Sequence, residues 1–198
     1  MSHVLDPTIP FASDDPVLQV AIAMFERDGW IDVRSLAKEA GIGRATLYRR
    51  YGDRDRILGE VVWALFLAAA ARQRSDYHGR GAEGIAEAIG KSQRAGAEMP
   101  AMRKFVTEHT DVALRVMTSS HGVLQRRVIA SIVRLMLLEI GEPPDIDAAT
   151  LAYAVARVGE SFYHRELITG EPPDYDAAAV IIRRLLNYQP VRPPNRAD

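Results

Sequence analysis

The sequence predicts an all-α protein with a small N-terminal unit of three helices, followed by a larger helical domain. Apolar residues recur at intervals of three and four along most of the chain, which is the period of an amphipathic helix. β-Branched residues do not gather into the alternating runs that are typical of strands. With 198 residues, 47% of them hydrophobic and 26% charged, the chain can bury a sizeable core.

Capping and turn residues divide the first third of the chain into short helices. Pro16 suits a first helical turn, and the acidic residues before it can cap free backbone N–H groups. Gly29 is placed to end this helix in the left-handed conformation. Asp32 can cap a short second helix, and a glycine-containing turn leads to a third helix at 44–51. Asp53 then caps a long fourth helix.

The rest of the chain is divided by glycine and proline. A glycine-rich break at 78–84 follows the fourth helix, and a proline-rich segment at 190–198 ends the chain. We expect the first 15 residues to form a flexible arm and the last nine to form a disordered tail. Between them the pattern predicts further helices at 83–95, 101–117, 122–140, 148–169 and 176–188.

Several functional classes find no support in the sequence. There are no cysteines, so disulfides and thiolate metal sites are excluded, and the five histidines are scattered without metal-binding spacing. Glu108, His109 and Asp111 are the nearest approach to a catalytic cluster, but adjacent residues on a helix point to different faces. We therefore expect no enzyme, no cofactor and no metal.

No segment indicates a membrane or secreted protein. The longest apolar run, Val61 to Ala71, is shorter than the roughly 20 residues that cross a bilayer. The N-terminal residues lack the basic and apolar regions of a signal peptide. We expect a cytoplasmic protein without a membrane partner.

A local basic patch coincides with a helix-turn-helix pattern. The net charge of the chain is −1, yet residues 34–56 hold seven basic and three acidic residues, a local charge of +4. Two short helices flank a glycine-containing turn in this segment, and the second helix of such a unit enters the major groove of DNA. Leu36, Ala37 and Leu47 can pack the helices together, which leaves arginines on the outer face.

This segment resembles the TetR family of transcriptional regulators. The resemblance rests on "FERDGW" and "VRSLAKEAGIGRATLYRRYGDRDRIL", and covers about residues 17–62. The sequence departs from the family pattern at Gly43, where a serine or threonine usually caps the recognition helix, at Arg50, where histidine is common, and at Arg54, where lysine is common. The resemblance implies a DNA-binding domain at 16–60 and a ligand-binding and dimerisation domain at 61–189.

The resemblance implies roles for the exposed residues of the first unit. Arg44, Ala45 and Thr46 would face base edges, and an arginine there suits bidentate contact with guanine. Tyr48, Arg34 and Arg54 would contact phosphates, and Arg49 and Arg50 could serve either purpose. One alternative is that these arginines are only a solvated basic face. Another is a protein-interaction module that keeps the helix-turn-helix shape without binding DNA; loss of the basic face would mark such a module, and this chain keeps that face. The partner implied is a double-stranded operator.

The resemblance also implies a homodimer formed by the last two helices. Small residues predict a close helix approach at Ala152, Ala156, Gly159 and Tyr163, and an apolar face in the last helix includes Ile181, Ile182, Leu185 and Leu186. Two such helices per subunit would pair as a four-helix bundle. The alternative is that both stripes pack inside one subunit.

A pocket for a small apolar or amphipathic effector is the last implication. Its expected apolar lining is Trp63, Phe66, Met102 and Phe105, with polar contacts from His109, Arg157 and Tyr163. The alternative is that the aromatic residues are plain core and that Arg157 forms a surface pair with Glu160. The phrase "RVGESFYHRELITGEPPD" is similar to one in an actinobacterial branch of the family that includes a regulator of lactone breakdown in quorum quenching.

Overall fold

The computed structural model describes residues 15–119 and 122–187, and within these ranges the predicted all-α fold is confirmed. The arm expected at 1–15, apart from Asp15, and the tail expected at 190–198 lie outside the described residues. The described helices are α1 Pro16–Asp28, α2 Val33–Glu39, α3 Arg44–Tyr51, α4 Arg54–Arg72, α5 Arg74–Tyr77, α6 Gly81–Glu98, α7 Pro100–Glu108, α8 Thr110–Thr118, α9 Val123–Glu139, α10 Ala148–Tyr163, α11 Arg165–Thr169 and α12 Tyr175–Leu186.

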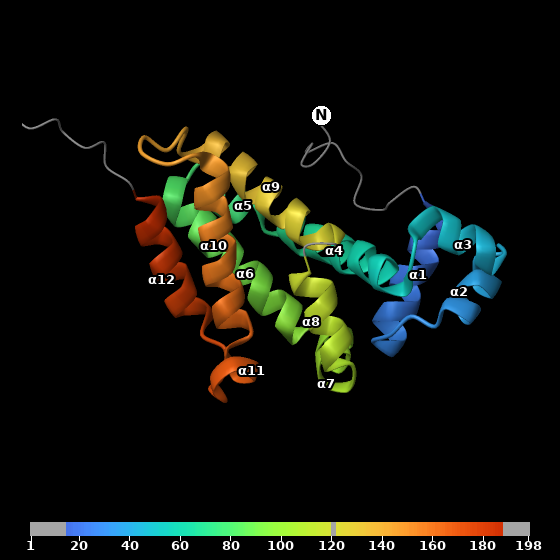
Figure 1. The fold of residues 1–198 in the computed structure, drawn as a ribbon. Coiled ribbons are helices and arrows are strands. Elements are labelled where there is room, and N and C mark those ends of the chain that lie inside the picture. Colours follow the sequence, from blue (N-terminus) through green and yellow to red (C-terminus); the bar gives the residue numbers. More distant parts are fainter. Residues whose placement is uncertain (1–14, 120–121, 188–198) are drawn as a thin grey trace, which may run out of the picture.

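Helices α1–α3 form a small unit at one end of the molecule, here called the head (Figure 1). Helix α4 leaves the head and runs into the larger body, where α6, α9, α10 and α12 lie together. Helices α7 and α8 lie between these two groups, and both α1 and α4 contact this pair. The head is thus joined to the body by more than one helix.

The predicted caps of the head are confirmed. The carboxylates of Asp15, Asp32 and Asp53 accept hydrogen bonds from the backbone N–H groups of the first turns of α1, α2 and α4. Gly29 ends α1 with φ of 66°, in the left-handed region where side chains are strained. These caps fix where α1, α2 and α4 begin, whereas α3 begins after Gly43 without a side-chain cap.

Two of the long helices predicted after the fourth helix are not continuous, so those predictions are wrong: each segment is broken at a histidine. The segment predicted at 101–117 is two helices, since His109 leaves the helical region with φ of −133° and ψ of 42°. The segment predicted at 148–169 ends at Tyr163, and His164 is buried at the break before α11. Neither break carries a glycine or proline, so tertiary contacts set them. The short helix α5 was not predicted.

Buried apolar residues form two clusters. The first, here called the shared cluster, joins α1–α4 with α7, α8 and the start of α9. At its centre Phe25 of α1 meets Phe105 of α7 edge to face, with ring centroids 5.5 Å apart. The second, here called the body cluster, lies among α6, α9, α10 and α12, and includes Met136, Val155 and Ile182. The shared cluster therefore ties the head to the body.

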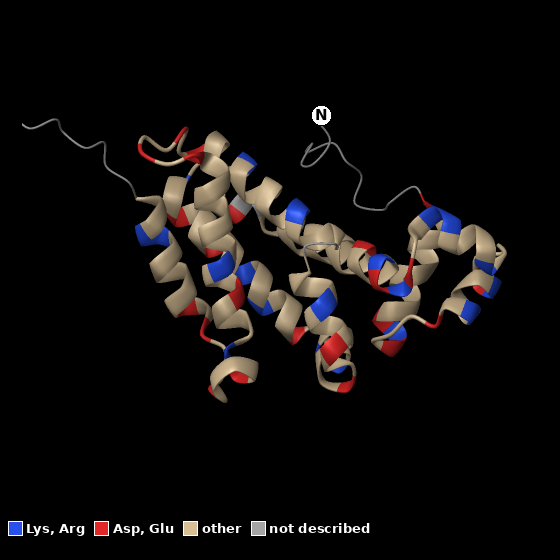
Figure 2. Ribbon diagram, viewed as in Figure 1, with Lys and Arg blue, Asp and Glu red and all other residues tan. Residues whose placement is uncertain are grey.

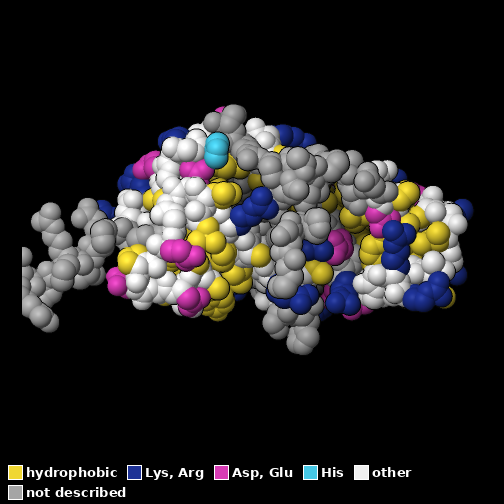
Figure 3. Space-filling view, turned by 90° about the horizontal axis from the view of Figure 1, so that it is seen from above, with side chains coloured by type: hydrophobic (Ala, Val, Ile, Leu, Met, Phe, Trp, Pro, Cys, Tyr) yellow, Lys and Arg dark blue, Asp and Glu magenta, His cyan; other side chains and the backbone are white. Residues whose placement is uncertain are grey.

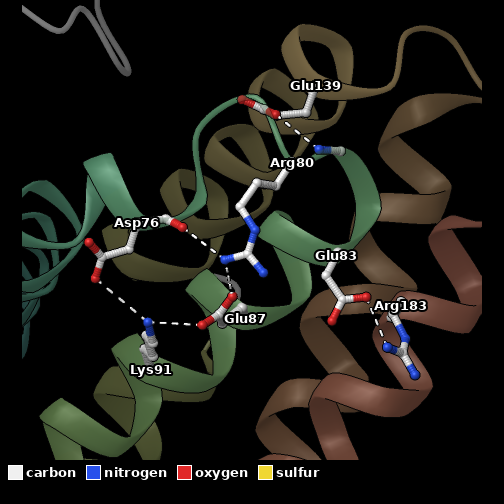
Figure 4. A network of polar contacts seen from close by, with 8 residues as sticks. Asp76, Arg80, Glu83, Glu87, Lys91, Glu139 and Arg183 are labelled. Carbon is white, nitrogen blue, oxygen red and sulfur yellow. Dashed lines mark hydrogen bonds and ion pairs between the residues drawn. The ribbon is translucent and has the colours of Figure 1, made fainter.

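The carboxylate of Glu139 fastens the α5–α6 loop to the end of α9 (Figure 4). It accepts hydrogen bonds from the backbone N–H groups of Gly79, at 2.9 Å, and Gly81, at 3.3 Å, and from His78 Nδ1 at 2.7 Å. Burial raises the pKa of Glu139, but these hydrogen bonds outweigh it, so the pKa lies below its ordinary value. Beyond the loop, Arg183 of α12 pairs with Glu83 of α6 at 2.8 Å.

Candidate DNA-binding surface

The third helix is seated in the head by one buried side chain. Leu47 is fully buried, whereas the other residues of α3 are exposed or half-buried. Leu47 packs with Leu36 and Ala37 of α2 in the shared cluster. Gly41 makes the turn between the helices with φ of 66°, and no other atom lies within 4 Å of the position that a Cβ would take. With only Leu47 buried, the outward face of α3 is left exposed.

That outward face is basic. All eight residues predicted to contact DNA are exposed: Arg34, Arg44, Ala45, Thr46, Tyr48, Arg49, Arg50 and Arg54. Lys and Arg positions gather along the ribbon of the head in Figure 2, and Figure 3 shows Lys and Arg side chains on the surface at the same end of the molecule. The fold therefore brings together on one small unit the residues that the sequence singled out.

Two of these arginines have partners within the protein. Arg50 forms an ion pair with the carboxylate of Asp15, at 3.0 Å. The guanidinium of Arg54 lies over the ring of Trp30, 4.9 Å from its centroid, which is a cation–π geometry. Both arginines remain exposed, so each could still reach a phosphate. The sequence indicated neither pairing, because its pattern predicted only a capping role for the acidic residues before Pro16 and no role for Trp30.

The hydroxyl of Tyr51 donates a hydrogen bond to the same carboxylate. Burial, together with this hydrogen bond and the charge of Asp15, raises the pKa of Tyr51 above its usual value. The phenol therefore stays protonated and remains a donor at any physiological pH. Asp15 thus contacts both of the last two residues of the recognition helix, and the sequence analysis missed this role.

The head contacts α7 and the break between α7 and α8 through aromatic rings and close backbone packing. The ring of His109, at the break between α7 and α8, stacks on Trp30 with centroids 3.8 Å apart. Gly29 lies against α7, where a Cβ would come within 2.9 Å of Lys104 Cβ and 3.0 Å of the Ala101 carbonyl oxygen. On the surface, Arg115 of α8 pairs with Asp55 of α4. A shift of α7 or α8 would therefore displace residues of the head.

The residues predicted to line an effector pocket lie in three groups, at α7, α4 and α10. Met102, Phe105 and His109 belong to the contact between α7 and the head, where Phe105 is fully buried. Trp63 and Phe66 stack on each other along α4, with centroids 5.5 Å apart. Arg157 lies in α10, and the half-buried Tyr163 at its end packs against the shared cluster. A hollow of about 290 Å³ between α1 and α4 is lined by none of these seven residues.

Arg157 belongs to a partly buried polar group between α9 and α10. It donates hydrogen bonds to Gln125 and, at 2.8 Å, to the carboxylate of Glu160. Gln125 also donates to Glu160 and to the Met117 carbonyl. Burial raises the pKa of Glu160, although its hydrogen bond with Gln125 and the charge of Arg157 oppose this. Among the described residues, the buried Nε of Arg157 and Oε1 of Gln93 have no hydrogen-bond partner.

The residues predicted at the dimer interface also divide into two sets. Ala152, Ala156, Gly159, Ile182 and Leu186 are buried within the protomer, and a Cβ on Gly159 would meet the Gln93 amide at 2.7 Å. The close helix approach predicted for the small residues is thus made inside one subunit. Ile181 and Leu185 are exposed on α12, next to the exposed Val180, and Tyr153 is exposed on α10.

Comparisons with known proteins agree with this geometry. The model of the bacterial regulatory proteins of the tetR family matches residues 17–61, which hold α1–α3 and the start of α4. The model of the tetracyclin repressor-like C-terminal domain matches residues 80–187, more than half of the chain. The chain belongs to the TetR family. It is a DNA-binding transcriptional regulator, and proteins of this family are regulators rather than enzymes.

Two solved structures are similar to this chain, and the first, a TetR-family repressor, shares its fold. The transcriptional repressor QsdR of R. erythropolis is 22% identical, with a TM-score of 0.77, and the match covers 86% of this chain and 92% of that one. The multidrug binding protein EbrR, solved with imidazole, is 16% identical with a TM-score of 0.47, covering 90% of this chain and 97% of that one. No curated protein matches the sequence.

None of the helices in the described part of the chain is both long and apolar enough to cross a membrane. Residues 15–119 and 122–187 contain no group of three or more His, Asp or Glu side chains arranged to hold a metal ion.

Proposed function

We propose that this TetR-family regulator is a ligand-responsive repressor that binds a palindromic operator as a homodimer. The observation that carries the proposal is the exposed basic face of α3, which is seated by Leu47 on a capped three-helix head. The second helix of a helix-turn-helix unit, here α3, reads the major groove. A two-fold dimer presents two such recognition helices to two half-sites of the operator. Such a protein acts on the chromosome, which in a bacterium lies in the cytoplasm.

The roles of the DNA-binding residues follow from their places on the head. Arg44, Ala45 and Thr46 open α3 and are all exposed, so they would meet base edges. Tyr48 and Arg49, with Arg34 of α2 and Arg54 of α4, would contact phosphates. We expect Arg44→Ala to weaken operator binding by about 1–3 kcal/mol and relax preference at one base. Arg54→Ala should weaken all sequences alike.

Binding to DNA from the upstream region of the gene tests this proposal. Fluorescence anisotropy at two salt concentrations, with random-sequence duplex as competitor, separates specific from general affinity. Tight binding that survives the competitor supports the proposal, and fragments selected from the whole genome extend the search to distant operators. If no genomic fragment is preferred over random DNA, the protein acts through protein contacts. An equal loss on operator and random DNA for Arg44→Ala would remove its base-reading role.

The proposed dimer uses the exposed faces of α10 and α12. Val180, Ile181 and Leu185 form an exposed apolar stripe on α12, and Tyr153 adds an aromatic side chain on α10. Pairing these faces across a two-fold axis gives a four-helix bundle. We expect Leu185→Glu to produce monomers in sedimentation experiments, because a carboxylate would be buried without a partner. Ile168→Glu is the matched control, since Ile168 is exposed on α11, outside the stripe. A dimer that survives Leu185→Glu would contradict this interface.

The proposed effector is a small apolar or amphipathic molecule that binds in the body. The unsatisfied Arg157 Nε and Gln93 Oε1 could offer it a donor and an acceptor. A ligand that prefers a conformation with α4, α7 and α8 displaced would change the spacing of the two heads and lower operator affinity. Release of operator DNA by a ligand in the anisotropy assay, lost in Arg157→Met, is the expected result. The phrase at 157–174 and the shared fold of QsdR support a place in the same branch of the family.

A further inference from the structure

The carboxylate of Asp15 joins the start of α1 to the end of the recognition helix. One oxygen, Oδ1, caps α1 by accepting a hydrogen bond from the backbone N–H of Val17 at 3.0 Å. The other, Oδ2, accepts a hydrogen bond from the hydroxyl of Tyr51 and pairs with the guanidinium of Arg50 at 3.0 Å. The side chain of Asp15 is only 18% exposed. Arg50 and Tyr51 both belong to the last turn of α3.

These contacts matter because α3 has few other anchors. Leu47 is its buried residue, and it lies near the middle of the helix. The last turn of α3 is followed at once by Gly52, whose φ of 87° breaks the helix. The hydrogen bond from Tyr51 to Asp15 therefore fixes the end of α3 relative to the start of α1. Small errors in the direction of α3 would move base-reading side chains out of hydrogen-bond range.

The same carboxylate neutralises part of the basic face. Arg50 is 52% exposed, and its neighbours Arg44 and Arg49 are exposed on the same short helix. A free arginine at this place would pair with the nearest DNA phosphate, whatever the sequence of the DNA. While Arg50 is paired with Asp15, a phosphate must displace a carboxylate to reach it. The pair thus lowers general affinity for DNA.

We propose that Asp15 is a specificity-determining residue that positions α3 through Tyr51 and withholds Arg50 from random DNA. The proposal rests on the proposed function only in assuming that α3 faces DNA. On the operator, base contacts hold α3 in register and Arg50 stays with Asp15. On random DNA, the ion pair with Asp15 keeps Arg50 from contacting a phosphate. Asp15 therefore widens the difference in affinity between operator and random DNA.

The Asp15→Asn variant separates charge from capping. Asparagine caps a helix about as well as aspartate, and its amide oxygen can still accept the Tyr51 hydrogen bond. Removal of the charge frees Arg50, which adds one phosphate contact per subunit. The slope of log affinity against log salt for random duplex should steepen by about 0.9 per subunit, which corresponds to roughly five- to tenfold tighter binding for each subunit that contacts the DNA at about 0.1 M salt. Operator affinity should change less than twofold, because the register that base contacts impose on α3 keeps Arg50 beside residue 15 and away from a phosphate. The preference for operator therefore falls.

Two further variants test the route of the effect. Arg50→Gln should abolish the response to Asp15→Asn, so that the double variant binds random DNA like Arg50→Gln alone. Tyr51→Phe removes the hydrogen bond without changing any charge, so it should weaken operator binding several-fold and leave the salt slope for random duplex unchanged. Thermal unfolding followed by circular dichroism shows that each variant is folded at the temperature of the assay.

The outcomes are decisive for Asp15. An unchanged salt slope in Asp15→Asn, or a steeper slope that persists in the Arg50→Gln background, overturns the proposal. If the wild-type protein prefers no fragment over random duplex, the proposed function fails, but the random-duplex slopes of the variants still decide whether Asp15 withholds Arg50. A structural defect alone would weaken binding to both DNAs, and would not steepen the slope.

Discussion

The shared cluster and the body cluster divide the chain differently from the two family domains. The family models match residues 17–61 and 80–187, so α7 and α8 belong to the C-terminal match. In the packing, however, α7 and α8 belong with the head, because Phe25, Phe105 and Val116 lie in one cluster. The body cluster contains α6, α9, α10 and α12 and no residue of the head. Sequence domains and packing units are therefore not the same in this protein.

The difference suggests how a signal in the body could reach DNA. A long helix such as α4 can transmit a shift along its axis, but the head also rests on α7 through Phe105 and on His109 through Trp30. The polar group around Gln125 reaches the end of α8 through the Met117 carbonyl. An effector that rearranges this group would displace α8 and α7, and hence change the contacts of Phe105 and His109 with the head. For an effector to lower DNA affinity in this way, the shared cluster must have two packing arrangements, and the effector must bind the protein more tightly in one of them.

The largest expected effect compares a buried side chain in each cluster. Phe105→Ala should lower the free energy of unfolding by about 3–5 kcal/mol and Met136→Ala by about 2–5 kcal/mol, since truncation leaves a cavity at a fully buried site. Only Phe105→Ala should also weaken operator binding by the folded protein, because the head loses its seat on α7. Urea unfolding followed by circular dichroism, with anisotropy under native conditions, measures both.

The shape of the unfolding curve sharpens this comparison. If the head and α7 form one packing unit, Phe105→Ala shifts the unfolding of the whole shared cluster together. A separate early transition of the head, or an equal loss of operator affinity in Met136→Ala, would show that the two clusters do not divide the protein in this way.

The next effect compares two glycines with the same backbone conformation. Gly29 and Gly41 both have φ of +66°, but a Cβ at Gly29 would meet α7, whereas nothing lies within 4 Å at Gly41. Gly41→Ala should therefore cost only the left-handed strain, about 1–2 kcal/mol. Gly29→Ala should cost about 1–3 kcal/mol more, because Lys104 and the Ala101 carbonyl must move. Equal shifts of the urea midpoint would mean that α7 does not press on the head.

Local signals explain why the head could be predicted better than the body. Asp32, Asp53 and Gly29 act through their own neighbours in the chain, so their caps could be recognised without a structure. The breaks at His109 and His164 depend on what these rings pack against, Trp30 in one case and the protein interior in the other. No local residue pattern indicates such a break.

The functional surfaces show the same limit. The exposed arginines of α3 could be predicted, since a motif fixes which face is outward. The contacts of Asp15 with Arg50 and Tyr51 span about 36 residues and could not. In α10 and α12, apolar stripes were assigned to a partner subunit, although Ala152, Ala156 and Ile182 are buried in the protomer. Periodicity shows which residues share a face, but not which neighbour covers it.

The smallest expected effect concerns an ion pair that links α4 to α9. Arg127 donates two hydrogen bonds to the carboxylate of Glu60, at 2.7 and 3.0 Å, and both side chains are partly exposed. A double-mutant cycle with Glu60→Gln and Arg127→Gln should give a coupling energy of about 0.5–1 kcal/mol in the free energy of unfolding, because solvent screens most of the attraction. The coupling should fade as salt is raised. A coupling well above this range that persists in high salt would mean that the pair itself holds α4 and α9 together, and the link between the two clusters would then be electrostatic rather than apolar.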